Sequence, residues 1–203
     1  MTNTSRSAPA PATLLPAPAD RHAGLPSRRA CLIAVAAGPL ALPGPAQAAT
    51  DGSALAFARL DDARSTLERL AQGPRRPPGP GSWNWPQTLQ HLAQSIEFSM
   101  QGFPQSKPAW FQRTLGSAAF GFFRWRGRMT HGLTEPIPGA PDLDATLADS
   151  AALARLTQAM ARFQAWNGPL VPHFAYGDLD KTRYDQAHAM HLAEHLSLFL
   201  PQG

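Results

Sequence analysis

The last predicted helix, residues 184–199, carries the side chains whose types and spacing suit metal binding. Three of the chain's seven histidines, His188, His191 and His195, lie in it. Helical residues three, four and seven apart share a face, so the three rings form one stripe. His191 and His195 are one turn apart, a spacing at which two imidazoles can hold the same ion. An i, i+4 pair alone is a weak signal, and a helix with partly exposed histidines is the alternative interpretation.

The N-terminal segment has the layout of an export signal. A twin arginine, Arg28-Arg29, precedes an apolar run over residues 31–37, and Ala46-Gln47-Ala48 is a small-residue cleavage site. This order predicts a removable leader over residues 1–48 and a mature domain over 49–203, exported to the periplasm or secreted by the twin-arginine route. The apolar run is too short for a permanent span, so no stable membrane span is expected after the leader is removed. The alternative is a disordered, Pro- and Ala-rich tail followed by a short core helix.

The composition of the mature chain excludes several classes of function. The whole chain has 18 Lys+Arg against 14 Asp+Glu, and the leader takes four arginines and one aspartate with it, which leaves a net charge of +1. A nucleic-acid partner is therefore not expected. The only cysteine, Cys31, also leaves, so disulfide and thiol chemistry are excluded. The remaining 155 residues are enough for one domain with a core. The oligomeric state is open, and a homodimer is compatible with the sequence.

Apolar residues spaced three and four apart predict helices and no strands of useful length. The fold class is therefore all-α: a four-helix bundle with an extra aromatic helical segment after a disordered leader. His91 falls on a flank of the second helix, away from its Leu/Ile stripe. The aromatic, arginine-rich segment has two interpretations: a surface that contacts an anionic ligand or lipid headgroup, or aromatics packed on the bundle with arginines reaching outward. The first helix is expected over residues 53–72, and the second opens within residues 83–86 and runs to about 101. The aromatic segment is expected to be helical over 110–129 (as one helix or two). Two more helices are expected, one from 142 or 144 to 166 and one that follows a cap at Asp178 or Asp180.

Three motifs resemble the DinB/YfiT-like superfamily, and more closely a branch of it known only as a domain of unknown function. They are Trp85-x₄-Leu89-x-His91-Leu92, Pro172-His173-Phe174-x₂-Gly177-x-Leu179 and His191-Leu192-x₂-His195-Leu196-x₂-Phe199. The resemblance implies a four-helix bundle that holds a divalent metal ion with His91, His191 and His195. Relatives often have a histidine where Glu194 stands, which leaves the role of Glu194 open. Thiol transfer, known in some relatives, is not expected of an exported protein.

Three neutral imidazoles would leave positions open on Zn²⁺, Ni²⁺, Mn²⁺ or Fe²⁺, where water can be activated. His188 is a candidate for proton handling beside the metal, or a buried histidine satisfied by its neighbours. His173 and Tyr176 are candidates for contacting an unidentified small molecule, or residues of an exposed loop. Glu194 points about 100° away from the ligands, and His131 is assigned no role.

The sequence therefore predicts an exported, metal-binding bundle with hydrolase-like activity. The alternative is a non-catalytic binding or scaffolding domain with vestigial histidines. Haem ligation is a weaker third hypothesis, since no c-type attachment motif is present.

Overall fold

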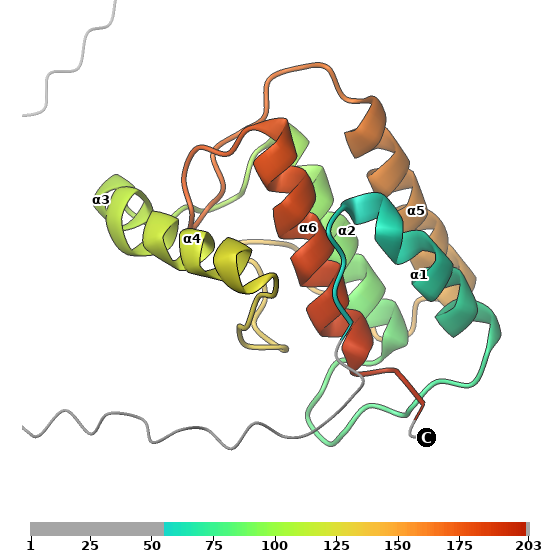
Figure 1. Ribbon diagram of the computed structural model, residues 1–203. Coiled ribbons are helices and arrows are strands. Elements are labelled where there is room, and N and C mark those ends of the chain that lie inside the picture. The colour runs from blue at the N-terminus through green and yellow to red at the C-terminus, as the bar shows by residue number, and fades with distance from the viewer. Residues whose placement is uncertain (1–54, 202–203) are drawn as a thin grey trace, which may run out of the picture. The chain divides into compact units, whose positions relative to one another are not determined.

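The computed structural model describes residues 55–201, and these residues confirm the all-α fold class (Figure 1). Helix α2 packs against α5 and α6, and α1 packs against α6. The closer assignment to a DinB-like bundle stays a prediction, and the predicted leader lies outside the described residues. No helix of the described part is both long and apolar enough to cross a membrane. The α-helices are α1 (Ala63–Gln72), α2 (Trp85–Gln101), α3 (Ala109–Phe111), α4 (Ser117–Arg126), α5 (Asp149–Ala165) and α6 (Lys181–Ser197). A short 3-10 helix, η1 (Leu60–Asp62), precedes α1, and a π-helical stretch, η2 (Gln112–Gly116), joins α3 to α4.

Helix α2 has the predicted bounds because its start is fixed by its own sequence. The Asn84 side chain accepts a hydrogen bond from the Gln87 backbone, and the Gln87 side chain accepts one from the Asn84 backbone. This reciprocal pair satisfies two N–H groups that a helix start leaves free. Pro86 occupies the first turn, where its missing N–H costs nothing. The helix is buried on more than one side.

The first helix is shorter than the sequence predicted. Residues 55–59 are not helical, and helical structure begins at Leu60. The Leu55 N–H donates to Ser197 Oγ at 3.1 Å, and the Leu60 N–H donates to an Asp185 carboxylate oxygen at 3.3 Å. Because α6 side chains satisfy these backbone donors, the segment follows α6 instead of forming its own helix turns. The predicted C-terminal boundary is confirmed: the Gly73 N–H bonds to the Arg69 carbonyl.

The aromatic segment forms one helical run through α3, η2 and α4, although its glycines suggested a break. Gly116 is buried, and a Cβ built there would lie 1.9 Å from the Ala175 carbonyl oxygen. This glycine therefore permits a close approach between the helix and the 173–177 loop. The run ends at Gly127, which has the left-handed φ of 71° typical of a helix terminus.

Helix α5 begins at Asp149, several residues later than predicted. The backbone of Asp144 is held instead by Gln90 of α2, which donates to its carbonyl and accepts from its N–H. The Asp144 side chain caps a local turn by accepting from the Thr146 N–H and hydroxyl. Helix α6 starts as expected, with the Asp180 carboxylate accepting from the Arg183 N–H.

Candidate metal centre

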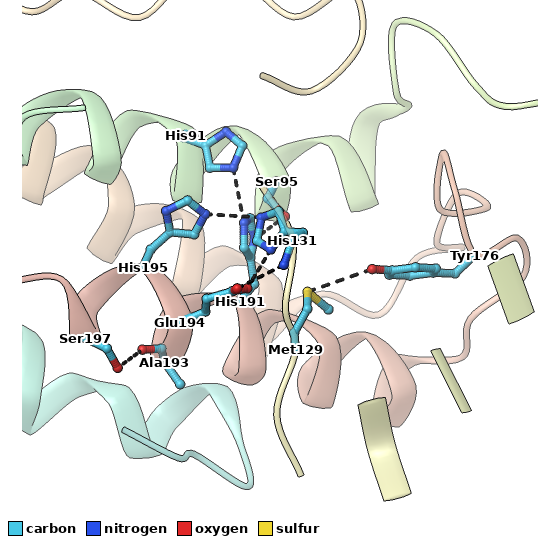
Figure 2. Close-up of polar contacts among 10 residues, drawn as sticks. All are labelled: His91, Ser95, Met129, His131, Tyr176, His191, Ala193, Glu194, His195 and Ser197. Atoms are coloured by element: carbon cyan, nitrogen blue, oxygen red, sulfur yellow. Dashed lines mark hydrogen bonds and ion pairs between the residues drawn. The ribbon is translucent and has the colours of Figure 1, made fainter. Parts of the chain in front are cut away.

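Four histidine rings from three separate segments meet at one point (Figure 2). His91, His131, His191 and His195 can each offer a ring nitrogen such that the four atoms lie within 4.8 Å of one another. The Nε2 atoms of His91 and His191 are 3.1 Å apart, and those of His195 and His131 are 3.3 Å apart. Two imidazole nitrogens on one tetrahedral ion, each about 2.05 Å from it, would be about 3.3 Å apart. The observed spacing therefore fits a shared divalent ion.

Two packed helices position three of these rings. His91 comes from the middle of α2, and His191 and His195 come from successive turns of α6. Because α2 packs against both α5 and α6, His91 is buried although it lies off the Leu/Ile stripe of this helix. The exposed fractions are 2% for His91, 8% for His191 and 0% for His195. The structure thus brings together the three residues that the resemblance named.

Burial keeps these three imidazoles neutral. It lowers the pKa of His91 to about 3, helped by His131 nearby, and holds the pKa of His191 and His195 well below the usual value. A neutral imidazole has a free ring lone pair, which a metal ion requires. Among the described residues, His91 Nδ1 and His195 Nδ1 are buried without a hydrogen-bond partner. These are the second nitrogens of rings whose Nε2 atoms face the cluster, so the protein supplies an orienting partner for His191 and His131 and, in the part of the chain that the structure describes, none for these two rings.

The fourth ring, His131, is oriented by Glu194. The His131 backbone N–H donates to one Glu194 carboxylate oxygen at 2.9 Å, and Nδ1 contacts the other at 2.5 Å. Since a carboxylate accepts, Nδ1 carries a proton, and Nε2 points at His195. Glu194 precedes His195 by one residue, so on the helix its side chain points about 100° away from that of His195. In this direction it meets the loop that carries His131. Sequence reasoning assigned no role to His131 and left that of Glu194 open.

Two further side chains hold the rings of the cluster. Ser95 lies one turn after His91 on α2, and its hydroxyl is 3.2 Å from His191 Nδ1. This contact fixes the ring and directs its Nε2 towards His91. Trp83 lies against His91 with ring centroids 4.7 Å apart and stacks on His195 at 6.1 Å. The aromatic ring thus covers part of the cluster.

A cavity of about 200 Å³ adjoins the cluster, and the residues predicted to contact a small molecule line its wall. His91, His131 and His191 line it, together with His173 and Tyr176 of the 173–177 loop. His173 stacks on Tyr176 at 4.3 Å, and its Nδ1 accepts from the backbone N–H groups of residues 175 and 176. Burial, reinforced by Glu194, raises the pKa of Tyr176 to about 12, so its hydroxyl stays protonated. Both side chains therefore line a cavity wall instead of an exposed loop.

His188 lies outside the four-histidine cluster, although it shares a face of α6 with two of its members. Its Nε2 is 3.3 Å from the Ser99 hydroxyl, and its ring meets Phe163 edge-on at 5.0 Å. It is 2% exposed, and burial lowers its pKa to about 3. These contacts favour the interpretation of His188 as a buried histidine satisfied by its neighbours, although it also reaches the cavity wall.

Comparison with known proteins gives a family and no closer relative. Neither the curated proteins nor the solved structures gave a match. A family model described as a protein of unknown function, DUF1569, matches residues 49–202. This agrees with the predicted branch of uncharacterised domains, while the wider DinB-like placement stays a prediction. The chain belongs to the DUF1569 family.

Proposed function

We propose that this protein binds one divalent metal ion and uses it in a hydrolase-like reaction on a small molecule. The observation that carries the proposal is the convergence of four ring nitrogens within 4.8 Å, three of them on buried helical histidines. His91, His191 and His195 hold the ion in this proposal, since burial keeps them neutral and the helices fix them. Zn²⁺, Ni²⁺, Mn²⁺ and Fe²⁺ all accept imidazole ligands.

His131 is the proton-handling group in this proposal. Its side chain is 26% exposed, lies on a loop and lines the cavity, unlike the fully enclosed His195. A divalent ion supplies a Lewis acid that lowers the pKa of water and polarises a carbonyl or phosphoryl oxygen. His131 Nε2 can take a proton at that place, and the Glu194 carboxylate then stabilises the resulting imidazolium. A histidine oriented by a carboxylate in this way can act as a base or as a metal ligand, and its exposure to the cavity is the reason for assigning it the first role.

The cavity limits the size and character of the substrate. Its volume, about 200 Å³, is below the roughly 300–1,000 Å³ typical of sites for drug-sized ligands. Apolar and aromatic side chains form much of the wall, including Phe111, Ile137 and Phe174, and Lys107 and Glu135 add one charge of each sign. These features favour a small, mainly apolar ester or amide.

Metal analysis of the full chain tests the proposal. Protein purified without chelators should contain about one divalent ion per chain, and the ion should raise the melting temperature because it binds only the folded state. The metal-loaded protein should hydrolyse p-nitrophenyl acetate faster than the chelator-treated protein. Metal at background level, with no change in melting temperature on adding any of the four ions, would instead support a non-catalytic domain with vestigial histidines.

Substitution of His131 separates a proton-handling group from a fourth ligand. His131→Ala and Glu194→Gln should each keep metal affinity within about tenfold of wild type and lower the hydrolysis rate on the order of 100-fold. The reason is that neither residue holds the ion in the proposal, whereas both serve the same proton transfer. The measurements are a competition titration with a chromogenic chelator and an ester hydrolysis assay. If His131→Ala loses metal as completely as removal of a helical histidine, His131 is a ligand.

We also propose that the protein acts outside the cytoplasm after removal of residues 1–48. The family match begins at residue 49, directly after the predicted cleavage site, which supports this boundary. A protein exported already folded could carry its metal with it. N-terminal sequencing of the exported protein should begin at or near Ala49, and export that is insensitive to replacement of Arg28 and Arg29 would contradict the twin-arginine route.

A further inference from the structure

The helical run 109–126 presents an aromatic-basic face, defined here by Trp110, Leu115, Phe122 and Trp125 with the cations around them. These four side chains are 65%, 60%, 49% and 82% exposed, and they are the large apolar side chains that are exposed in the described part of the chain. All four lie within sixteen residues of one segment. Figure 1 shows α3 and α4 to one side of α1, α2, α5 and α6.

The two exposed aromatic residues of α4 share one side of a firmly attached segment. Phe122 and Trp125 are three residues apart in α4, which places them on the same helix face, and their ring centroids are 5.7 Å apart. The opposite side is fixed to the protein, since Phe120 is buried and stacks on Tyr176 at 5.3 Å. Arg124, which is exposed, reaches across to α6 and donates to the Gln186 side chain at 2.7 Å. The apolar face therefore points outward because the other face is already occupied.

The charged residues of this segment have one sign. Between Glu97 and Glu135 the sequence has five basic residues and no acidic residue. Within residues 55–201, the ion pairs all involve other basic side chains. Lys107 lines the cavity beside the histidine cluster and Arg124 bonds to Gln186, which leaves Arg113, Arg126 and Arg128 available to an external anion. Each of these three is exposed.

We propose that the aromatic-basic face docks on the surface of a bilayer that contains anionic phospholipid. Tryptophan favours the membrane–water interface, and arginine beside it can pair with phosphate headgroups while its stem stays on apolar surface. Apolar burial and attraction to anionic lipid together give reversible interfacial binding without a spanning helix. A second copy of the chain is a poor occupant, since a two-fold contact would bring the same cations against each other. This inference is independent of the metal centre.

Flotation of the full chain with vesicles tests the proposal. The protein should bind vesicles of equal parts phosphatidylglycerol and phosphatidylcholine, bind pure phosphatidylcholine vesicles at least tenfold more weakly, and dissociate as NaCl is raised. The double variant Phe122→Ala/Trp125→Ala should bind the anionic vesicles at least tenfold more weakly. Arg126→Gln should weaken binding about fivefold. Arg162→Gln, at an exposed position on α5, is the matched charge control and should bind as wild type does.

The design separates this face from other sources of membrane affinity. Every variant carries residues 1–48, so a difference between variants reports the aromatic-basic face. Equal binding of wild type and the double variant to anionic vesicles would overturn the proposal. So would a wild-type dimer that the double variant converts to monomer while neither binds vesicles, because the face would then join two copies. Binding that survives a chelator agrees with the proposal.

Discussion

Replacing His191 with alanine is expected to remove the bound divalent ion, with a loss of affinity on the order of 100-fold or more. Its Nε2 lies 3.1 Å from that of His91, and it is one turn from His195, so it links the ligands of α2 and α6. Loss of a residue that merely orients a ligand typically costs about 10- to 100-fold, and loss of a ligand itself should cost at least as much. Elemental analysis after dialysis and a chelator competition titration measure the effect.

His188→Ala is the matched control for that experiment. His188 is the same residue type, on the same helix, three positions earlier, and it is also buried. It lies outside the four-histidine cluster, so its removal should lower the melting temperature and leave metal affinity within about threefold. If both substitutions lower metal affinity equally, the effect comes from general disruption of α6. If neither does, His191 is not a ligand.

The sequence predicted elements well where the signals were local. Helix α2 has its predicted bounds because the Asn84–Gln87 capping pair and Pro86 are all within its first turn. Helix α6 begins at a predicted cap for the same reason. The elements that began late, α1 and α5, were shortened by side chains from distant segments: Ser197 and Asp185 for the first, Gln90 for the second. Apolar spacing could not show that another segment would bind these backbone groups.

The residues of the candidate site also divide into those that local sequence could predict and those that depend on contacts between distant segments. The spacing of His191 and His195 is a local helical property, and the resemblance added His91, whose burial depends on packing against two helices. His131 lies on a loop 63 residues from Glu194, and no periodic pattern connects them. The one available signal was the direction of Glu194, which required a neighbouring element to face it. The aromatic segment shows a third case: both interpretations were compatible with its sequence, and only the structure shows that Phe120 packs inward while Trp125 is exposed.

The metal-free protein is expected to lose stability steeply as the pH falls from about 6.5. Burial lowers the pKa of His91, His173 and His188 to about 3, and that of His191 and His195 is also well below the usual 6.5. Between about pH 6.5 and pH 3, the histidines of the unfolded chain bind protons that the buried histidines of the folded chain do not. The free energy of unfolding is therefore greatest above pH 6.5 and falls as the pH approaches 3. At pH 5.5 each such histidine costs on the order of 1 kcal/mol, so His173 and His188 alone contribute a few kcal/mol.

This loss is a large part of the roughly 5–15 kcal/mol that stabilises an ordinary domain, and the cluster histidines add to it. Urea unfolding with a chelator present, at several values between pH 7.5 and 5, measures the free energy at each pH. In His188→Gln the slope of that free energy against pH should correspond to about one proton fewer taken up on unfolding than in wild type, because glutamine does not titrate. Glutamine can still bond to Ser99, so this buried contact is kept. A free energy of unfolding that stays constant over this range would show that the rings take up protons in the folded state as readily as in the unfolded chain. Rings that titrate in this way would not be the buried, neutral imidazoles that the proposed metal site requires.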